Sequence, residues 1–176
     1  MDDAGQQDAA DDTVGNGMGR LTEVYTSQST TKYLQYDARG RVLQHRQKTA
    51  GVDYGVFSTS YDPGGWVSQM VYPSGRVVAY TGDTAGRMTA VKRGDGSAYA
   101  TVTGFSPEGI GPRTIALGNG LVESWDYGSQ RYRQARRVRL GTAGNGTSVG
   151  EWQFRYCGTG DWATECATNN GNVRSQ

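Results

Sequence analysis

Residues whose side chains could do chemistry are few in this chain and lie far apart. His45 is the only histidine, so Ser-His or Cys-His catalysis would have to use it, and its neighbours Gln44 and Arg46 indicate a polar strand rather than a triad. One histidine also rules out a His-based metal site. Residues 146–150 fit the G-x-S-x-G pattern of hydrolase elbows, but an elbow needs a strand before the serine and a helix after it, and the chain predicts a loop and a strand there. We therefore expect no catalytic, cofactor-binding or metal-binding residue and no enzyme activity.

Two further groups of residues suggest binding rather than catalysis. Residues 93–95 spell the Arg-Gly-Asp tripeptide that integrins read, although Asp95-Gly96 is also an ordinary turn pair with Arg93 at its flank. The second group is a basic cluster around Tyr132, made of Arg131, Arg133, Arg136, Arg137 and Arg139. On a strand, residues 131, 133, 137 and 139 share one face, which would either meet an acidic partner or be balanced by acids of the fold. We favour the turn pair and the balanced face.

The overall charge gives no support for a charged partner. Lys and Arg number 18 against 17 Asp and Glu, so we expect neither nucleic acid nor an anionic membrane as partner. No stretch is apolar enough to span a bilayer or to form a signal-peptide core. Cys157 and Cys166 are the two cysteines; they either form a disulfide or stay free thiols in a reducing cell, since a metal site would need two more ligands than the neighbourhood offers.

Six copies of a short signature define the elements that carry these residues. Each copy starts with an aromatic residue or its substitute, usually continues with Asp, and has a glycine about four residues after its start. The copies begin at residues 36, 61, 82, 105, 127 and 156, a spacing that indicates a repeat array. The structural residues of the clear copies are Tyr36, Asp37, Gly40, Arg41, Tyr61, Asp62, Gly65, Asp83, Gly86 and Arg87.

The residue types of the signature suit a strand, a tight reversal and a second strand. A Tyr offers an apolar ring with a polar tip, so a stack of them can fill a wall while each hydroxyl finds a partner. An Asp directly after it can turn the chain by bonding its own backbone, and the Gly tolerates the positive φ that closes the turn. The arginine after the glycine, Arg41 or Arg87, can pair with a carboxylate or lie on a ring face.

The signature resembles that of the RHS or YD-repeat family, whose repeats carry Tyr-Asp, then Gly-Arg-Leu or Gly-Arg-Val, then a second turn of the Asp-Gly or Asn-Gly kind. Second turns are present here at residues 73–76, 95–96 and 119–120, and the resemblance covers residues 19 to 176. We expect the copies that depart from the pattern to bend or end differently; the departures are Gly82, Phe105-Ser106, Arg131 and Cys157.

The resemblance implies a structural function. Proteins of this family form long β-sheets that spiral into hollow shells, as in bacterial polymorphic toxins and insecticidal toxin complexes, where the shell encloses a toxic C-terminal domain, and in teneurins. It implies here an all-β array of antiparallel hairpins forming a curved, twisted sheet or part of a hollow shell that encapsulates or presents a toxin or effector. The implied partners are the remainder of a longer repeat protein or further copies of this chain, together with an enclosed toxin domain. The implied location is extracellular or at the cell surface.

A carbohydrate- or cell-surface-binding module is the alternative function. The chain has four Trp and eleven Tyr, and such rings on a sheet can stack on sugars. Trp66 and Trp125 are the candidate glycan contacts, and burial of these rings in the wall would count against this hypothesis.

Apolar residues between the turns alternate with a period of two and never show sustained helical spacing. We predict residues 1–18 as a mobile acidic lead-in and residues 19–176 as one repeat domain. Residues 171–176 are comparable to 40–45, so the chain is predicted to stop mid-hairpin, with a last strand that pairs with a neighbouring subunit or forms a sheet edge. The predicted strands are 41–48, 56–61, 66–72, 76–81, 87–93, 97–105, 113–118, 121–127, 132–140 and 150–156.

Overall fold

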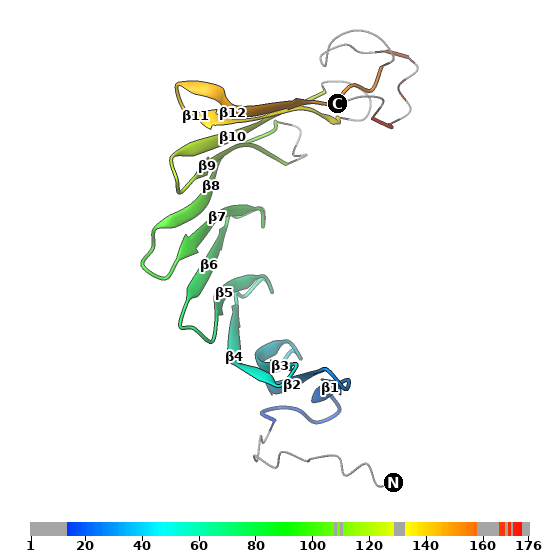
Figure 1. Cartoon of the computed structure of the whole chain (residues 1–176), viewed down its shortest axis with the longest axis vertical. Helices are drawn as coiled ribbons and strands as arrows, with labels where there is room; N and C mark the ends of the chain where they lie inside the picture. Colours follow the sequence, from blue (N-terminus) through cyan, green and yellow to red (C-terminus); the bar gives the residue numbers. More distant parts are fainter. Residues whose placement is uncertain are drawn as a thin grey trace. The chain divides into compact units, whose positions relative to one another are not determined.

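The computed structural model describes residues 14–107, 109, 111–128, 133–157, 166, 167, 169 and 171–173. These residues form β-strands and no helix (Figure 1), which confirms the all-β prediction. Within these ranges there is accordingly no helix with the length and apolar character needed to cross a membrane. The strands are β1 (Glu23–Tyr25), β2 (Ser29–Tyr36), β3 (Val42–Thr49), β4 (Val52–Tyr61), β5 (Val67–Val71), β6 (Val77–Gly82), β7 (Met88–Arg93), β8 (Ala98–Phe105), β9 (Pro112–Leu117), β10 (Leu121–Tyr127), β11 (Ala135–Thr142) and β12 (Asn145–Gln153).

The order of the strands in the sheet follows the order of the chain from β1 to β12. Every strand pair whose register is defined is antiparallel. The chain divides into two compact units, Met1–Val78 and Ala79–Gln176, and each is described by itself. The first unit holds β1 to β5 and the second holds β7 to β12, while β6 begins in the first and ends in the second. Each unit is thus a meander of hairpins, as expected for an array whose repeats contact their sequence neighbours.

Two kinds of hairpin connection join the strands. In the tight kind, Ala50 and Gly51 lie between the paired residues Thr49 and Val52 and both have positive φ, 49° and 81°, as a two-residue type I′ turn requires. The wider kind spans five residues and places a left-handed glycine fourth. This geometry is a type I turn followed by a G1 bulge, and it fixes the register of the flanking strands.

The hairpin at residues 72–76 shows the wider turn. The N–H of Tyr72 donates to the carbonyl of Arg76 at 2.8 Å, and the N–H of Gly75 donates to the carbonyl of Tyr72 at 2.9 Å. Gly75 has φ 80°. Only a residue that tolerates positive φ fits there, which is why the second turns of the sequence carry glycine.

The predicted strands agree with the observed ones in the middle of the chain and differ toward its ends. The sequence pattern misses β1 and β2, because the β2 segment is rich in Ser, Thr, Lys and Gln. It starts β4 at residue 56, whereas the tight Ala50-Gly51 turn lets the strand begin at Val52. It also starts β12 at residue 150, whereas Thr142 pairs with Asn145 and leaves a turn of two residues. β11 accordingly runs to Thr142, beyond the predicted end at 140.

The structure places residues 14–18 beside β2 rather than apart from the sheet. The N–H of Gly15 donates to the carbonyl of Leu34 at 3.0 Å, and the N–H of Tyr36 donates to the carbonyl of Gly15 at 2.9 Å. Asn16 Nδ2 donates to the carbonyl of Tyr36 at 3.0 Å. Residues 14–18 of the predicted lead-in 1–18 therefore contact the repeat array, and residues 1–13 lie outside the described part of the chain.

An aromatic row crosses the sheet of the first unit. Tyr33 pairs with His45, and His45 pairs with Phe57. The His45 and Phe57 rings are stacked with centroids 4.8 Å apart, and the Tyr72 ring meets Phe57 edge-on at 5.7 Å. Aromatic cross-strand pairs of this kind stabilise a sheet and hold its register.

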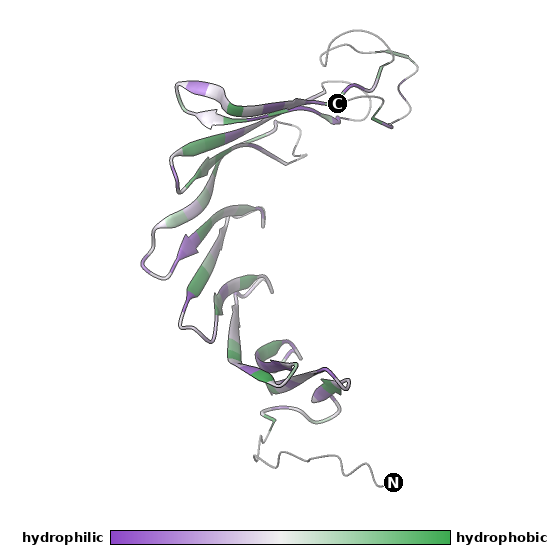
Figure 2. Cartoon of the chain, viewed as in Figure 1, coloured by the Kyte–Doolittle hydropathy of each residue, from purple (hydrophilic) through white to green (hydrophobic). Residues whose placement is uncertain are grey.

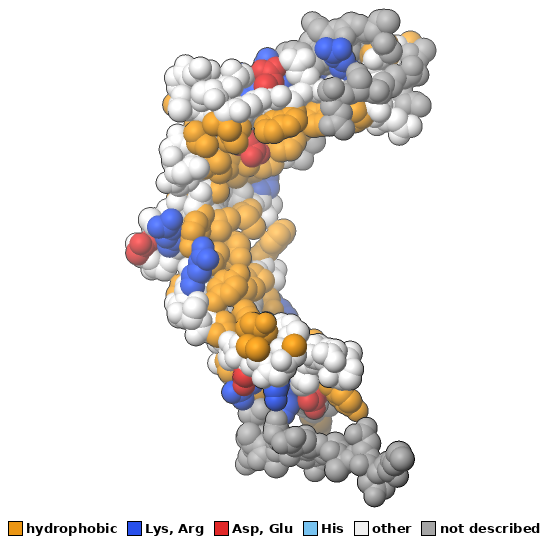
Figure 3. Space-filling view, viewed as in Figure 1, with side chains coloured by type: hydrophobic (Ala, Val, Ile, Leu, Met, Phe, Trp, Pro, Cys, Tyr) orange, Lys and Arg blue, Asp and Glu red, His pale blue; other side chains and the backbone are white. Residues whose placement is uncertain are grey.

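In the second unit, strands β10 to β12 carry large apolar side chains on one face and ion-paired side chains on the other. Trp125 pairs with Val138, which pairs with Trp152. On the alternate positions of the same strands, Asp126 pairs with Arg137, so the opposite face is polar. Figure 2 shows hydrophobic and hydrophilic residues interspersed along the strands, and Figure 3 shows hydrophobic side chains gathered into patches on each unit, with charged side chains beside them.

Few side chains are fully enclosed. Among the described residues the buried hydrophobic ones are Tyr36, Val78, Ala90 and Cys157. A single layer of sheet leaves most side chains half exposed, so the contacts between neighbouring hairpins must hold the structure together.

Candidate functional site

Asp37 is the centre of the first clear signature turn. Its Oδ1 accepts the N–H groups of Arg39 and Arg41, both at 2.9 Å, and its Oδ2 accepts Arg41 Nε at 2.6 Å. The N–H of Asp37 donates to the carbonyl of Arg41 at 2.9 Å and the N–H of Gly40 donates to the carbonyl of Asp37 at 3.0 Å, while Gly40 has φ 89°. One carboxylate thus ties together the whole turn, and we call this arrangement the Asp clasp.

Asp83 repeats the Asp clasp in the second unit. Its Oδ1 accepts the N–H groups of Ala85 and Arg87 at 2.9 Å, and its Oδ2 accepts Arg87 Nε at 2.8 Å. The backbone bonds recur at 2.9 and 3.0 Å, and Gly86 has φ 75°. The clasp is therefore a property of the signature and not of one turn.

Asp62 forms the backbone half of the clasp. Its Oδ1 accepts the N–H of Trp66 at 2.9 Å, and Gly65, with φ 97°, occupies the glycine position. Trp66 stands where the other two turns have Arg, so this turn has no guanidinium to pair with its carboxylate.

The clasp lowers the pKa of its carboxyl group. For Asp37 the backbone N–H of Arg41 is the main cause of a pKa below the ordinary value, with the Arg41 guanidinium adding to it. For Asp83 the N–H of Arg87 and then its side chain lower the pKa in the same way. Hydrogen bonds to the charged form favour that form, so both clasps hold an ionised carboxylate.

The four signature tyrosines each hydrogen-bond to a segment that precedes their own copy. In every case the phenolic O–H donates to a backbone carbonyl 15 to 21 residues earlier. We call this contact the tyrosine latch. Burial raises the pKa of Tyr127 and Tyr156, which keeps their hydroxyls protonated and able to donate. The latches are Tyr36 to Leu21, Tyr61 to Val42 at 3.1 Å, Tyr127 to Pro112 at 2.9 Å and Tyr156 to Ala135 at 2.8 Å.

Signature arginines make a second link between successive copies. The guanidinium of Arg41 lies 4.3 Å from the centre of the Tyr61 ring, and a Cβ atom placed on Gly65 would lie 3.5 Å from Arg41 Nη1. In the same way Arg20 lies 5.2 Å from the Tyr36 ring centre. The arginine of one copy therefore covers the aromatic ring and the turn glycine of the next, a cation–π contact of about 0.5–2 kcal/mol depending on how far it is desolvated.

The departing copies lose particular parts of these links. Gly82 has neither ring nor hydroxyl. Phe105 keeps the ring, over which Arg87 lies at 4.1 Å, but has no hydroxyl for a latch. Ser106 replaces the clasp Asp and closes a turn that is one residue longer, with its N–H donating to the carbonyl of Gly111 at 3.0 Å. Arg131 lies outside the described residues.

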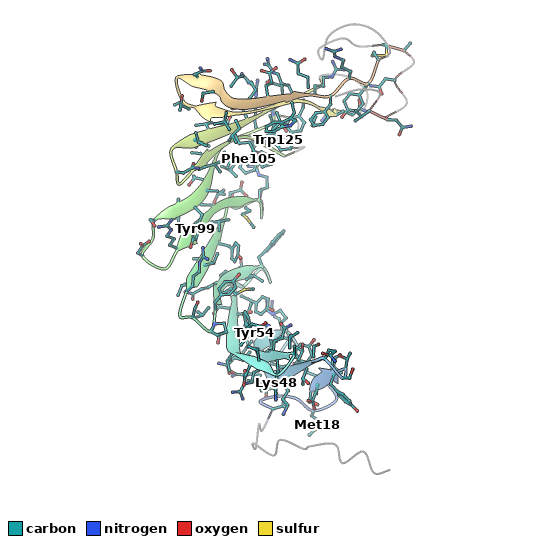
Figure 4. All side chains as sticks on the ribbon, viewed as in Figure 1. Met18, Lys48, Tyr54, Tyr99, Phe105 and Trp125 are labelled. Carbon is teal, nitrogen blue, oxygen red and sulfur yellow. A yellow bond between two sulfur atoms is a disulfide. The ribbon has the colours of Figure 1, made fainter. Side chains whose placement is uncertain are left out.

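The two candidate glycan contacts have different surroundings. Trp125 on β10 (Figure 4) stacks on Tyr127 with centroids 6.3 Å apart, and its Nε1 donates to Glu123. Its ring is thus held by the sheet's own side chains. Trp66 lies in a turn with 60% of its surface exposed. The structure does not bring the two tryptophans together on one hairpin.

The other candidates from the sequence have structural partners. His45 stacks on Phe57, and burial lowers its pKa. Ser148 lies within β12, where its Oγ accepts the N–H of Thr142 at 3.1 Å, so the G-x-S-x-G match is no elbow. Asp95 accepts both the N–H and the hydroxyl of Ser97, at 2.8 and 2.6 Å, as the turn-pair interpretation requires. Among the described residues no group of acidic, His and Cys side chains is placed to hold a metal ion.

The basic cluster is balanced within the sheet where the structure describes it. Arg137 Nε lies 2.7 Å and Arg139 Nη2 lies 3.2 Å from Asp126 Oδ2. Arg136 is buried on the alternate position. These contacts fit the solvated, charge-paired face that the sequence favours.

The sequence alone did not identify the carbonyl groups that accept the tyrosine latches, nor which arginine lies over which aromatic ring. Both depend on which hairpins become neighbours. The signal was nevertheless present, because Leu21 and Val42 each follow an arginine of a Gly-Arg pair. Aligning these two copies from the glycine onward places the latch acceptor directly after that arginine, whereas Pro112 follows Gly111 and Ala135 follows Gln134.

Comparison with known proteins agrees with this geometry. The family model RHS Repeat matches residues 60–98, which confirms the resemblance based on the signature. Among solved structures, TcdB2-TccC3 without its hypervariable C-terminal region aligns with a TM-score of 0.68 at 13% identity, covering 79% of this chain and 8% of that one. The Photorhabdus luminescens Tc holotoxin pore aligns with a TM-score of 0.66 at 13% identity, covering 79% and 7%. This chain therefore spans less than a tenth of those proteins, with which it shares its fold, and no curated protein sequence matches it.

Proposed function

We propose that this chain, which carries an RHS repeat, is a structural, non-catalytic segment of a longer RHS/YD-repeat shell that encapsulates or presents a toxin or effector domain. The observation that carries the proposal is the tyrosine latch, which recurs along the chain and always joins one hairpin to the one before it. A contact that repeats with the sequence signature builds a wall of any length from local rules. The signature residues link neighbouring hairpins, and this role requires no catalytic side chain.

The fold comparison supports the same function. The solved structures that it resembles are large toxin components named TcdB2-TccC3 and a Tc holotoxin pore, and this chain corresponds to a small share of their length. A segment of such a wall would act by geometry, by forming part of an enclosure. The corresponding location is outside the producing cell or on its surface.

The proposal is tested on the protein encoded by the complete reading frame that contains this chain, by imaging its structure and by measuring which parts of it resist protease. We expect residues 21–157 to appear as consecutive hairpins in the wall of an enclosure, with a C-terminal domain that resists protease while the wall is intact. Introducing Tyr36→Phe, Tyr61→Phe and Tyr156→Phe together removes three latches and should make that domain digestible, whereas Tyr54→Phe at an exposed ring should not. Hairpins that lie outside any enclosure, or a C-terminal domain digested equally in all forms, would overturn the proposal.

A glycan array separates this function from carbohydrate binding. A shell segment gives no signal that depends on Trp66 or Trp125. A signal that Trp66→Ala or Trp125→Ala abolishes, with the far-UV spectrum unchanged, would make the chain a binding module instead.

A further inference from the structure

The sixth copy of the signature contains a disulfide in place of the clasp carboxylate. Tyr156 makes the tyrosine latch to the Ala135 carbonyl at 2.8 Å, and the next residue, in the Asp position, is Cys157. Cys157 is bonded to Cys166, with the two Cα atoms 5.9 Å apart and a sequence separation of nine. The residues between the two cysteines lie outside the described part of the chain.

After Cys166 the chain returns to the geometry of the signature turn. Gly171 has φ 92°, close to the 89° of Gly40. A Cβ atom on Gly171 would lie 3.8 Å from Gln134 Nε2, as one on Gly40 would lie 3.3 Å from Arg20 Cζ. Gln134 directly precedes the latch acceptor of the sixth copy and so holds the position of the signature arginine. Gly171 is therefore the turn glycine of the sixth copy.

Asn169 takes over the polar part of the clasp. Its Oδ1 accepts the N–H of Gly171 at 2.9 Å, two residues ahead, as Asp37 accepts the N–H of Arg39. Its Nδ2 donates to Gln134 Oε1 at 2.8 Å, and Gln134 Nε2 donates back to Asn169 Oδ1 at 3.5 Å. Asn169 is only 5% exposed. The hydrogen-bonded side-chain amides of Asn169 and Gln134 thus link this turn to the preceding copy. In other copies a cation–π contact between an arginine and an aromatic ring makes that link.

The expanded turn needs a further constraint to reach this register. Fifteen residues separate Tyr156 from Gly171 (171 − 156), against four between Tyr36 and Gly40 (40 − 36). A longer free loop loses more entropy when its ends are fixed. The two hydrogen bonds between the side-chain amides of Asn169 and Gln134 offset that loss only in part. The disulfide removes nine positions from the loop, which brings the covalent path near the length of an ordinary signature turn.

We propose that the Cys157–Cys166 disulfide is a redox-sensitive joint that keeps Asn169 and residues 171–173 in the register of the repeat array. Reduction by a dithiol breaks the S–S bond with two electrons and two protons, leaving two cysteine thiols and the oxidised, cyclic disulfide of the reductant. The attack falls on the Cys166 sulfur, because Cys157 is only 6% exposed whereas Cys166 is half-buried. Once the joint opens, the Asn169–Gln134 pair has no covalent support, while the Tyr156 latch before the disulfide remains.

Hydrogen exchange with and without dithiothreitol tests the joint. In the oxidised protein we expect protection at Asn169 and Gly171, whose N–H groups bond to the Cys166 carbonyl and to Asn169 Oδ1. After reduction, with two free thiols verified by alkylation and mass, exchange there should accelerate at least tenfold while β7 to β9 are unchanged. Equal exchange in the two forms would overturn the proposal, and so would two alkylatable thiols in the untreated protein.

Two variants separate the disulfide from the amide pair. The double variant Cys157→Ser with Cys166→Ser should exchange at the same rates as the reduced protein. Dithiothreitol should not change those rates, so this variant also controls for other effects of the reagent. Asn169→Leu should accelerate exchange at Gly171 with the disulfide still closed. If Asn169→Leu leaves exchange at Gly171 unchanged, residues 171–173 are not held by the pair and the proposed register is wrong. None of these results depends on whether the chain belongs to a shell.

Discussion

The tyrosine latch reduces to one hydroxyl on one ring, so it can be removed without disturbing packing. Tyr61→Phe deletes the bond from Tyr61 to the Val42 carbonyl at 3.1 Å and leaves that carbonyl without its donor. We expect a loss of about 0.5–1.5 kcal/mol in the free energy of unfolding, the usual net value of one hydrogen bond. Urea unfolding followed by tryptophan fluorescence measures it. The matched control is Tyr54→Phe, at a side chain that is 51% exposed, which should change stability by less than about 0.5 kcal/mol.

The converse substitution adds a latch where the signature has lost it. Phe105 already lies beneath Arg87 but has no hydroxyl. By the register of the other copies, a phenol there would reach the carbonyl that follows Arg87. Phe105→Tyr should therefore raise the midpoint of thermal unfolding, by a gain of up to about 1 kcal/mol. A lower midpoint would mean that the latch geometry does not extend to this copy.

The turn glycines are required for their backbone conformation more than for space. Gly65 has φ 97°, and a Cβ atom there would meet only Arg41 at an ordinary contact distance of 3.5 Å. Gly65→Ala should cost about 1–2 kcal/mol, the penalty of a left-handed L-residue. Gly146→Ala is the control, since it has open space and no left-handed φ, and should stay within about 0.5 kcal/mol. Equal unfolding midpoints for the two variants would contradict the argument.

His45 should make stability depend on pH near neutrality. Burial lowers its pKa from the ordinary 6.5, so below that pH the unfolded chain binds a proton that the folded chain does not yet bind. Stability is then full above about pH 6.5 and falls as the pH drops, until the folded pKa is passed. His45→Phe should flatten urea midpoints measured between pH 8 and pH 5, and an unchanged slope in that variant would assign the effect to other groups.

At the scale of the element, the signature hairpins at Asp37 and Asp83 are each closed by a charged group at the turn. The clasp carboxylates have lowered pKa values, so their stabilisation is fully present above the ordinary carboxyl pKa near 3.8 and is lost as the pH falls through the lower folded values. Asp37→Asn with Asp83→Asn should reduce stability at pH 7 and weaken its decline between about pH 4 and pH 2. Part of the decline should persist, because Asp53 and Asp95 also have lowered pKa values. Parallel pH profiles for variant and parent protein would exclude the clasps as its source.

The wider hairpins could be predicted from sequence because their chemistry is local. Asp83 and Gly86 carry the turn by themselves, so strand boundaries near them fall within one residue of the structure. The tight turn at Ala50-Gly51 was missed, since Ala is a poor signal for a position with positive φ. The two-residue turn between Thr142 and Asn145 was missed as well, since Ala143 gives no turn signal. β2 was missed because its polar composition hides its strand pattern. It is held by pairing with β1 and β3, by residues 14–16 and by the Tyr36 latch, none of which a pattern inside residues 29–36 reveals. The latches and the arginine contacts join separate copies, and their partners are defined only once the hairpins are neighbours.

At the scale of the whole molecule, the links run from each copy to the one before it. Damage should therefore stay local, as in other repeat proteins where each unit contacts its neighbours alone. Hydrogen exchange of Tyr61→Phe should accelerate in β3 to β5 and stay at parent rates in β10 to β12. Uniform acceleration along the chain would show a single cooperative unit instead.

The scarcity of buried apolar side chains has a calorimetric consequence. Heat capacity rises on unfolding chiefly because apolar surface becomes hydrated, by about 12–15 cal/mol/K per residue in ordinary globular domains. Here the buried hydrophobic residues among those described are Tyr36, Val78, Ala90 and Cys157, so the heat-capacity increment per residue should fall below that range. A small increment flattens the curve of stability against temperature, so this sheet should keep a nearly constant, modest stability from the cold room to body temperature.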